Sequence, residues 1–122
     1  KGYTMKVTAN GQEFIISFGY SPVKQIKKGS KHPKRYSTAY LKRVVSKEEE
    51  PVLLMQESVS NHSHDPFVRA WGRSMAFAKV LNKFLEQNEY GLSVEDKQTF
   101  VNAFYEQCPK SRLVPVEFID LN

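Results

Sequence analysis

At 122 residues, with 40% hydrophobic and 25% charged residues, the chain has the size and composition of one globular domain, expected over residues 1–122. Its one cysteine, Cys108, excludes an intramolecular disulfide and a cysteine-rich zinc site. No apolar run approaches the roughly 20 residues of a membrane-spanning helix, so we expect no membrane contact.

The charge distribution is more informative than the net charge of +5. No acidic residue occurs between Phe14 and Ser46, whereas acids gather at 48–50 and in the last third of the chain. Such asymmetry predicts a positive surface and an acidic partner, for example a phosphate backbone. The alternative is a solvated lysine-rich loop. The basic residues of this interval are Lys24, Lys27, Lys28, Lys31, Lys34, Arg35, Lys42 and Arg43.

An N-terminal hairpin is predicted at Asn10-Gly11, which lies between two strand-like segments, Met5–Ala9 and Gln12–Phe18. Asn and Gly tolerate the positive φ that both central residues of a type I′ turn require. A two-residue turn pairs Val7 with Phe14, and further along it pairs Met5 with Ile16 and Tyr3 with Phe18. One face of the hairpin is then wholly apolar and the other mostly polar.

Residues 19–35 contain Gly19, Pro22, Gly29 and Pro33, and they predict a long loop. Two more strands are expected at Tyr36–Val45 and Val52–Ser60, because both segments are rich in β-branched, aromatic and aliphatic residues. The polar segment 46–51 joins them.

Two helices complete the predicted elements. Asp65 is a suitable N-cap and Pro66 a suitable first helical residue, so the first helix is expected from there to about Gln87. Ser93 starts the second helix, which carries Val94 on its apolar side and ends before Pro109. Residues 113–119 form either a short edge strand or a packed tail. The predicted fold is α+β, with an antiparallel sheet of about four strands in two hairpins packed against two C-terminal helices.

On a helical wheel the first helix has a broad apolar arc, which includes Trp71 and predicts its burial. The basic residues occupy a narrow arc that we expect to be exposed. Gly72 and Ala76 lie within this arc, and a mid-helix glycine needs a reason. One is the close approach of another backbone or a ligand, and the other is packing under the sheet or the second helix. The basic residues of this arc are Arg69, Arg73, Lys79 and Lys83.

Residues 65–81 resemble a segment of short bacteriophage and prophage proteins of unknown function, with the pattern D-x-F-S-[KR]-x-x-G-R-x-x-A-x-x-[KR]-A-L. The chain departs from it at Val68 and Val80. The resemblance, which spans about a third of the chain with the preceding strands, implies phage ancestry and a strand-strand-helix unit, and it carries no known activity. We separately expect the protein to lie in the cytoplasm of the host cell. The matching residues are Asp65, Phe67, Arg69, Gly72, Arg73, Ala76, Lys79 and Leu81.

Few residues suggest catalysis. In an extended strand His62 and His64 would point the same way, which leaves a small metal-dependent enzyme as one hypothesis. Asp65 is better explained as a helix cap, and Cys108 as a core residue. Phosphate-loop, serine-hydrolase and zinc-protease motifs are absent from the sequence. We therefore expect neither catalytic residues nor a cofactor.

The leading interpretation is a small non-catalytic accessory protein of phage type that binds nucleic acid or a nucleoprotein through its basic surface. Tyrosines beside the charge would supply stacking. The alternative is a protein-binding inhibitor of host machinery, such as an anti-CRISPR or another anti-defence factor. The expected binding residues are Lys24, Lys27, Lys28, Lys31, Lys34, Arg35, Tyr36, Tyr40, Arg69 and Arg73.

Overall fold

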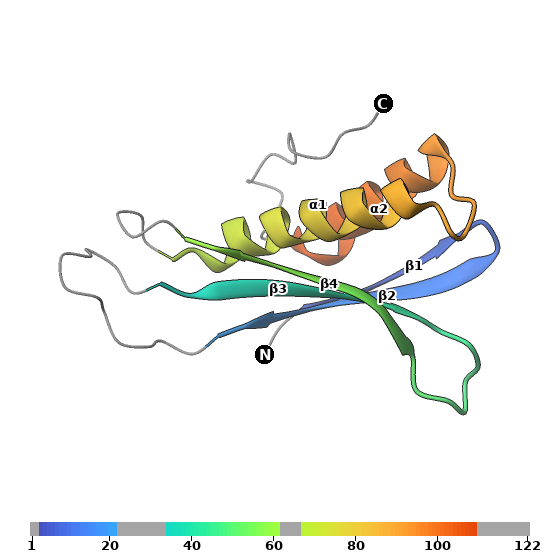
Figure 1. The fold of residues 1–122 in the computed structure, drawn as a ribbon, viewed down its shortest axis with the longest axis horizontal. Helices are drawn as coiled ribbons and strands as arrows, with labels where there is room; N and C mark the ends of the chain where they lie inside the picture. Colours follow the sequence, from blue (N-terminus) through green and yellow to red (C-terminus); the bar gives the residue numbers. More distant parts are fainter. Residues whose placement is uncertain (1–2, 22–33, 62–66, 110–122) are drawn as a thin grey trace.

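The computed structural model describes residues 3–21, 34–61 and 67–109, and it confirms the α+β fold. An antiparallel sheet with the strand order β1-β2-β3-β4 packs against two helices, which both lie on one face of the sheet (Figure 1). The elements are β1 (Thr4–Ala9), β2 (Gln12–Tyr20), β3 (Tyr36–Arg43), β4 (Val52–Ser60), α1 (Arg69–Gln87) and α2 (Val94–Gln107).

The N-terminal hairpin has the predicted turn and register. Asn10 and Gly11 have φ of 51° and 71°, and Val7 pairs with Phe14. The ladder begins at Thr4, so Tyr3 lies just outside it. The side chain of Asn10 donates to the carbonyl oxygen of Tyr90 over 3.0 Å, which ties the hairpin tip to the connection between the helices.

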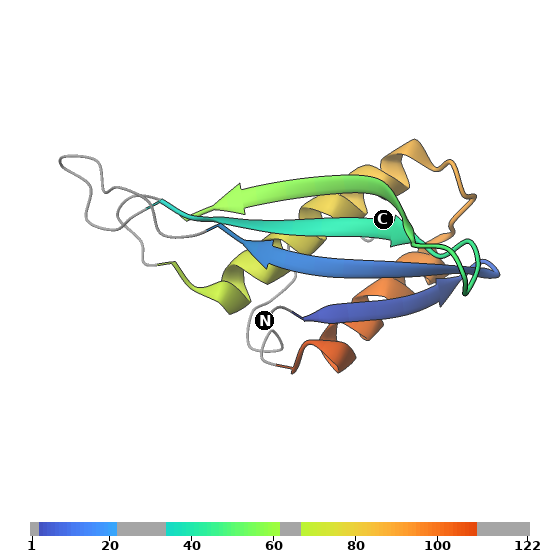
Figure 2. The ribbon, with the colours of Figure 1, turned by 90° about the horizontal axis from the view of Figure 1, so that it is seen from below.

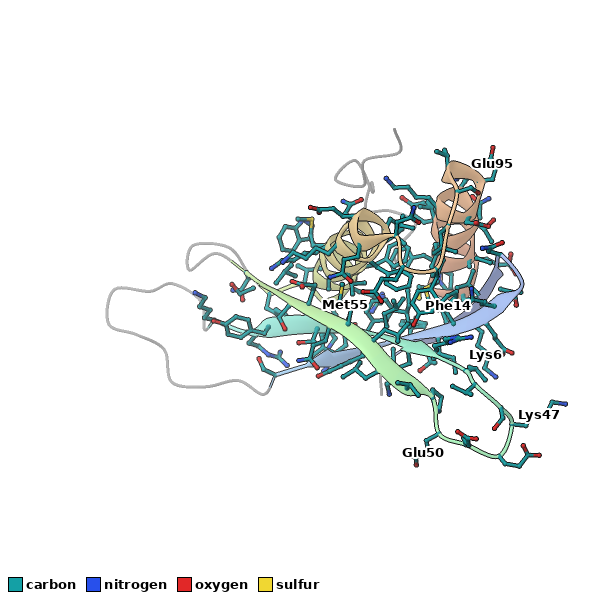
Figure 3. The ribbon with its side chains drawn as sticks, turned by 45° about the vertical axis from the view of Figure 1, so that its right-hand side comes forward. Lys6, Phe14, Lys47, Glu50, Met55 and Glu95 are labelled. Carbon is teal, nitrogen blue, oxygen red and sulfur yellow. The ribbon has the colours of Figure 1, made fainter. Side chains whose placement is uncertain are left out.

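Aromatic rings join the hairpin to both helices. The ring of Phe14 has no exposed surface and lies 5.6 Å from that of Phe84 in α1 and 5.7 Å from that of Phe100 in α2. Phe77 and Phe104 stack at 4.3 Å between the helices. Figure 3 shows Phe14 between the sheet and the helix layer, whereas Lys6 projects from the hairpin away from that layer. The covered face of the sheet is therefore the core.

The second helix begins as expected, with a complete capping box between Ser93 and Asp96. Its last residue, Gln107, occupies the outer edge of β1. The Gln107 amide accepts from the Lys6 backbone N–H over 2.8 Å and donates to the Lys6 carbonyl over 2.7 Å. A side chain here makes the pair of hydrogen bonds that another strand would make, so the middle of this sheet edge is occupied.

Three details of the helices differ from expectation. The first helix begins at Arg69, not at Asp65-Pro66, because Val68 is extended and no side chain caps it. Trp71 is 40% exposed, whereas burial was predicted. Val94, expected on the apolar side of the second helix, is 59% exposed because it is the first helical residue. The strand predicted to reach Val45 ends at Arg43.

The face of α1 that meets the sheet is centred on small residues. A Cβ atom added at Gly72 would overlap the Oγ of Ser37 and lie 2.9 Å from its Cβ. Gly72 therefore serves close packing of α1 on β3, which is the second of the two explanations that the sequence left open. This close approach turns Gly72, Arg73 and Ala76 toward the interior and leaves Trp71 outside. The segment 113–119, predicted as an edge strand or a packed tail, lies outside the described residues.

Candidate nucleic-acid interface

A basic–aromatic cluster, made of Tyr20, Phe67, Arg35 and Arg69, lies where β2 ends, β3 begins and α1 starts. The Arg35 guanidinium carbon is 4.3 Å from the centre of the Phe67 ring, and that of Arg69 is 5.0 Å from the Tyr20 ring. The two rings meet edge to face at 6.1 Å. Each arginine is thus held on an aromatic face by a cation–π contact.

Hydrogen bonds fix the backbone of this cluster. The Nε atom of Arg35 donates to the carbonyl oxygen of Ser21 over 3.0 Å. The backbone N–H of Arg35 donates to Oδ1 of Asn61, and that of Tyr36 donates to Oγ of Ser21. The start of β3 is therefore tied both to the end of β2 and to the residue after β4.

The two arginines of the cluster carry charge that no carboxylate neutralises within residues 3–21, 34–61 and 67–109. In these ranges the salt bridges join Glu57 to Lys79 at 3.6 Å and to Lys83 at 3.2 Å. Lys79 also donates to the Ser58 carbonyl oxygen over 3.0 Å. The predicted basic arc of α1 is therefore divided, because Lys79 and Lys83 are engaged by β4 while Arg69 is exposed at the helix start.

Arg73 was predicted on the exposed face, and this was wrong, since the residue is only 3% exposed. Its Nη1 donates to the Tyr20 hydroxyl over 2.8 Å, and its guanidinium carbon lies 4.4 Å from the centre of the Tyr3 ring. Arg73 therefore holds Tyr20 from the interior, on the same ring that Arg69 contacts. The close approach of α1 at Gly72 brings this neighbouring residue inside.

The second part of the interface is the open face of the sheet, the face that neither helix covers (Figure 2). On β3 the residues Ser37, Ala39 and Leu41 are buried, so the alternation sends the intervening side chains to the open face. These are Tyr36, Thr38, Tyr40 and Lys42. Tyr36 is 44% exposed, and the Lys34 ammonium lies 5.9 Å from the centre of its ring.

The structure thus gathers some of the predicted binding residues and separates others. Arg35 and Arg69 belong to one cluster, with Arg73 behind it, while Lys34 and Tyr36 lie beside it at the start of β3. Tyr40 lies apart, further along the open face. The predicted residues Lys24, Lys27, Lys28 and Lys31 are outside the described residues.

Three aromatic members of this region, Tyr3, Tyr20 and Phe67, were missed. The alternation that buries Phe14, Ile16 and Phe18 continues to Tyr20, so the period of the strand could have placed that ring on the helix side. Nothing in the local sequence indicates that Phe67 would contact Arg35, the residue before β3, because that contact depends on the packing of α1.

Two groups considered for chemistry from the sequence are the histidine segment and Cys108. No group of three or more His, Cys, Asp or Glu side chains in the described parts of the chain could hold a metal ion, and the segment with His62 and His64 is not described. Cys108 is fully buried, and burial raises the pKa of its thiol, an effect that the nearby charge of Arg73 partly offsets. A thiol with a raised pKa is a poor nucleophile near neutral pH.

Comparison with known proteins gives no relative: no family model, no curated protein and no solved structure matches the chain. The resemblance of residues 65–81 to a phage segment stays a prediction. Neither described helix is long and apolar enough to cross a membrane.

Proposed function

We propose that this protein is a small non-catalytic accessory protein, of phage type, that binds nucleic acid or a nucleoprotein, with Arg35 and Arg69 contacting phosphate groups. The observation that carries the proposal is the cluster itself, in which two arginines lie on aromatic rings and lack a carboxylate partner in the described ranges. A guanidinium offers paired N–H donors that match two phosphate oxygens.

Preorganisation strengthens this argument. A long exposed arginine normally loses side-chain freedom when it binds, which costs about 0.5–1.5 kcal/mol for each immobilised side chain. Stacking on Phe67 and Tyr20 restricts the two arginines before any ligand arrives. Arg73 contributes indirectly, because it holds the Tyr20 hydroxyl.

The proposal is tested by binding of labelled DNA and RNA over a range of salt concentrations. Contacts to phosphate release counterions, so log K should fall linearly with log[salt]. The double variant Arg35→Gln/Arg69→Gln should bind more weakly. Its salt slope for duplex DNA should be shallower by about 1.8, because each of the two lost phosphate contacts removes about 0.9. An unchanged slope, or no binding at low salt, would contradict the proposal.

The matched control is Lys79→Gln/Lys83→Gln, which removes the same formal charge. Both lysines pair with Glu57, so their loss should change the salt slope less than the loss of the two arginines. Equal losses in the two variants would mean that net charge, and not the cluster, determines binding.

The lysines of the basic loop are a separate prediction from the sequence. If Lys27, Lys28 and Lys31 contact phosphates, their joint replacement by alanine should flatten the salt slope and weaken binding to all sequences alike, because backbone contacts read no bases. If the triple variant binds like the parent, the loop is a solvated segment and binding rests on the arginine cluster.

A second candidate function, inhibition of a host protein by direct binding, is favoured by one observation. Val68 and Trp71 are 49% and 40% exposed on either side of Arg69 in the sequence. Tryptophan and arginine are enriched among the residues that dominate protein interfaces. In this case Trp71→Ala should abolish complex formation with one host protein, detected by affinity capture from nuclease-treated lysate, and leave binding to naked nucleic acid unchanged.

A further inference from the structure

The open face of the sheet differs from an ordinary solvated surface in its aromatic content. From the strand registers, the residues on this face are mainly small and hydroxylic, for example Thr4, Ser17, Thr38 and Ser58. The charged ones are Lys6, Lys42 and Glu13, and Glu13 is opposite Thr8 near the hairpin tip. Two tyrosines stand among them, on the strand that begins beside the basic–aromatic cluster.

Tyr40 is supported by a glycine. In the ladder it is opposite Ser17, yet a Cβ atom added at Gly19 would lie 3.4 Å from Cε2 and 3.8 Å from Oη of Tyr40. The ring therefore leans diagonally across the sheet and rests over Gly19, where there is no side chain. One side of the ring faces the strand, and the residue stays partly exposed on the other.

Tyr36 presents a second ring on the same face, at the edge that adjoins the cluster. Tyr40 lies four positions further along β3, which corresponds to about 13 Å along a strand. Lys34 lies over the Tyr36 ring, and Lys42 follows Tyr40 on the open face. Two rings thus lie between two positive charges along this face, which combines stacking surfaces with charge as single-strand binding proteins do.

The shape of this surface selects between forms of nucleic acid. The bases of a duplex are stacked within it, and a four-stranded sheet is wider than either groove of undeformed B-form DNA. An unpaired strand, by contrast, can turn its bases onto aromatic side chains. We propose that the open sheet face binds single-stranded nucleic acid, with bases stacked on Tyr36 and Tyr40 while Arg35 and Arg69 contact the backbone. This inference rests on the proposed function.

The test compares mixed-sequence oligonucleotides of about a dozen nucleotides, in single-stranded DNA, single-stranded RNA and duplex form. The parent should bind at least one unpaired strand more tightly than the duplex at the same salt concentration. Tyr36→Ala/Tyr40→Ala should weaken that binding by about tenfold or more, because a stacked base contributes substantially to affinity. Duplex binding and its salt slope should change little, since the arginines remain.

The matched control is Tyr36→Phe/Tyr40→Phe, which keeps both rings and removes only the hydroxyl groups. It should bind an unpaired strand nearly as well as the parent. If the phenylalanine variant loses as much as the alanine variant, hydroxyl contacts carry the affinity and stacking is wrong.

Other outcomes distinguish failure of base stacking on the sheet from failure of the proposed nucleic-acid binding. If duplex and unpaired strands bind equally, and the alanine variant keeps both affinities, the stacking face is wrong while phosphate binding by the arginines stands. If the parent binds no nucleic acid at low salt, both proposals fail. If the alanine variant does not fold, the parent protein is photocrosslinked to a single strand that contains iodouracil. The adducts should map to Tyr36 or Tyr40. Adducts elsewhere would overturn the inference.

Discussion

The two faces of the sheet are built from the same four strands and follow opposite rules. On the covered face, side chains such as Met5, Phe14 and Leu41 have no exposed surface and pack against the helices. On the open face, threonine, serine and lysine dominate, and Ile15 is only partly buried. Each large residue of the covered face has a packing role, whereas Tyr36 and Tyr40 lie outside the core cluster.

This difference separates the residues that packing explains from those for which we propose a role in binding. Apolar burial accounts for the covered face at about 25 cal/mol per Å². Most of the open face is explained by solubility alone. Tyr36 is 44% exposed, so burial contributes less there than at Phe14, and a base stacked on the ring would cover the remaining surface. The comparison becomes sharper when neighbouring positions on opposite faces are changed.

The largest effect is expected for Phe14→Ala. The ring contacts Phe84, Tyr90 and Phe100, and its removal leaves a cavity, so the free energy of unfolding should fall by about 3–5 kcal/mol. The neighbouring variant Ile15→Ala, on the open face, should cost about 1 kcal/mol. Denaturant unfolding measures both. Equal losses would mean that the open face is also covered in solution.

A smaller effect is expected for Gly72→Ala. Alanine improves helix propensity by about 1 kcal/mol, but its Cβ overlaps Ser37, and overpacking costs about 1–3 kcal/mol. We expect a net destabilisation. In a Ser37→Gly background the same change should become neutral or stabilising, because the overlap is gone. Two additive substitutions in this double-mutant cycle would show that α1 does not approach β3 so closely.

The sequence predicted local features well and the orientation of α1 poorly. The Asn10-Gly11 turn and the Ser93 cap depend on neighbouring residues only, and both are confirmed. Which side of α1 meets the sheet depends on distance between backbones, which Gly72 sets, and a helical wheel weighted by hydrophobicity does not contain that distance. Trp71 was therefore placed inside and Arg73 outside, the reverse of the structure.

The same limit applies to the candidate site. Charge asymmetry drew attention to Arg35 and the helical wheel to Arg69. Their joint attachment to Tyr20 and Phe67 is a tertiary contact between segments more than 30 residues apart in the sequence. Conversely, the pairing of Lys79 and Lys83 with Glu57 could not be foreseen, since Glu57 lies on another element.

Trp71 provides an inexpensive test of the orientation of α1, since it is the only tryptophan. With 40% of its surface exposed, its fluorescence should be quenched by acrylamide in the folded protein. Trp71→Ala should lower the free energy of unfolding by no more than about 1 kcal/mol, well below the 3–5 kcal/mol typical of a core tryptophan. Emission shielded from the quencher would mean that another part of the chain covers this side.

The smallest effect on stability is expected for Tyr36→Ala. The ring is 44% exposed and, among the described residues, it contacts the ammonium group of Lys34, so the free energy of unfolding should change by no more than about 0.5 kcal/mol. Tyr40→Ala should cost more, about 1 kcal/mol, because that ring rests over Gly19 and shields its backbone. Both values come from the same denaturant titrations as Phe14→Ala. If Tyr36→Ala instead lowers the free energy of unfolding as much as a core substitution does, the ring has a structural role. Tyr40 is then the one ring left to support a binding surface. If stability is unchanged while affinity for an unpaired strand falls, the tyrosine is kept at this position for binding and not for folding.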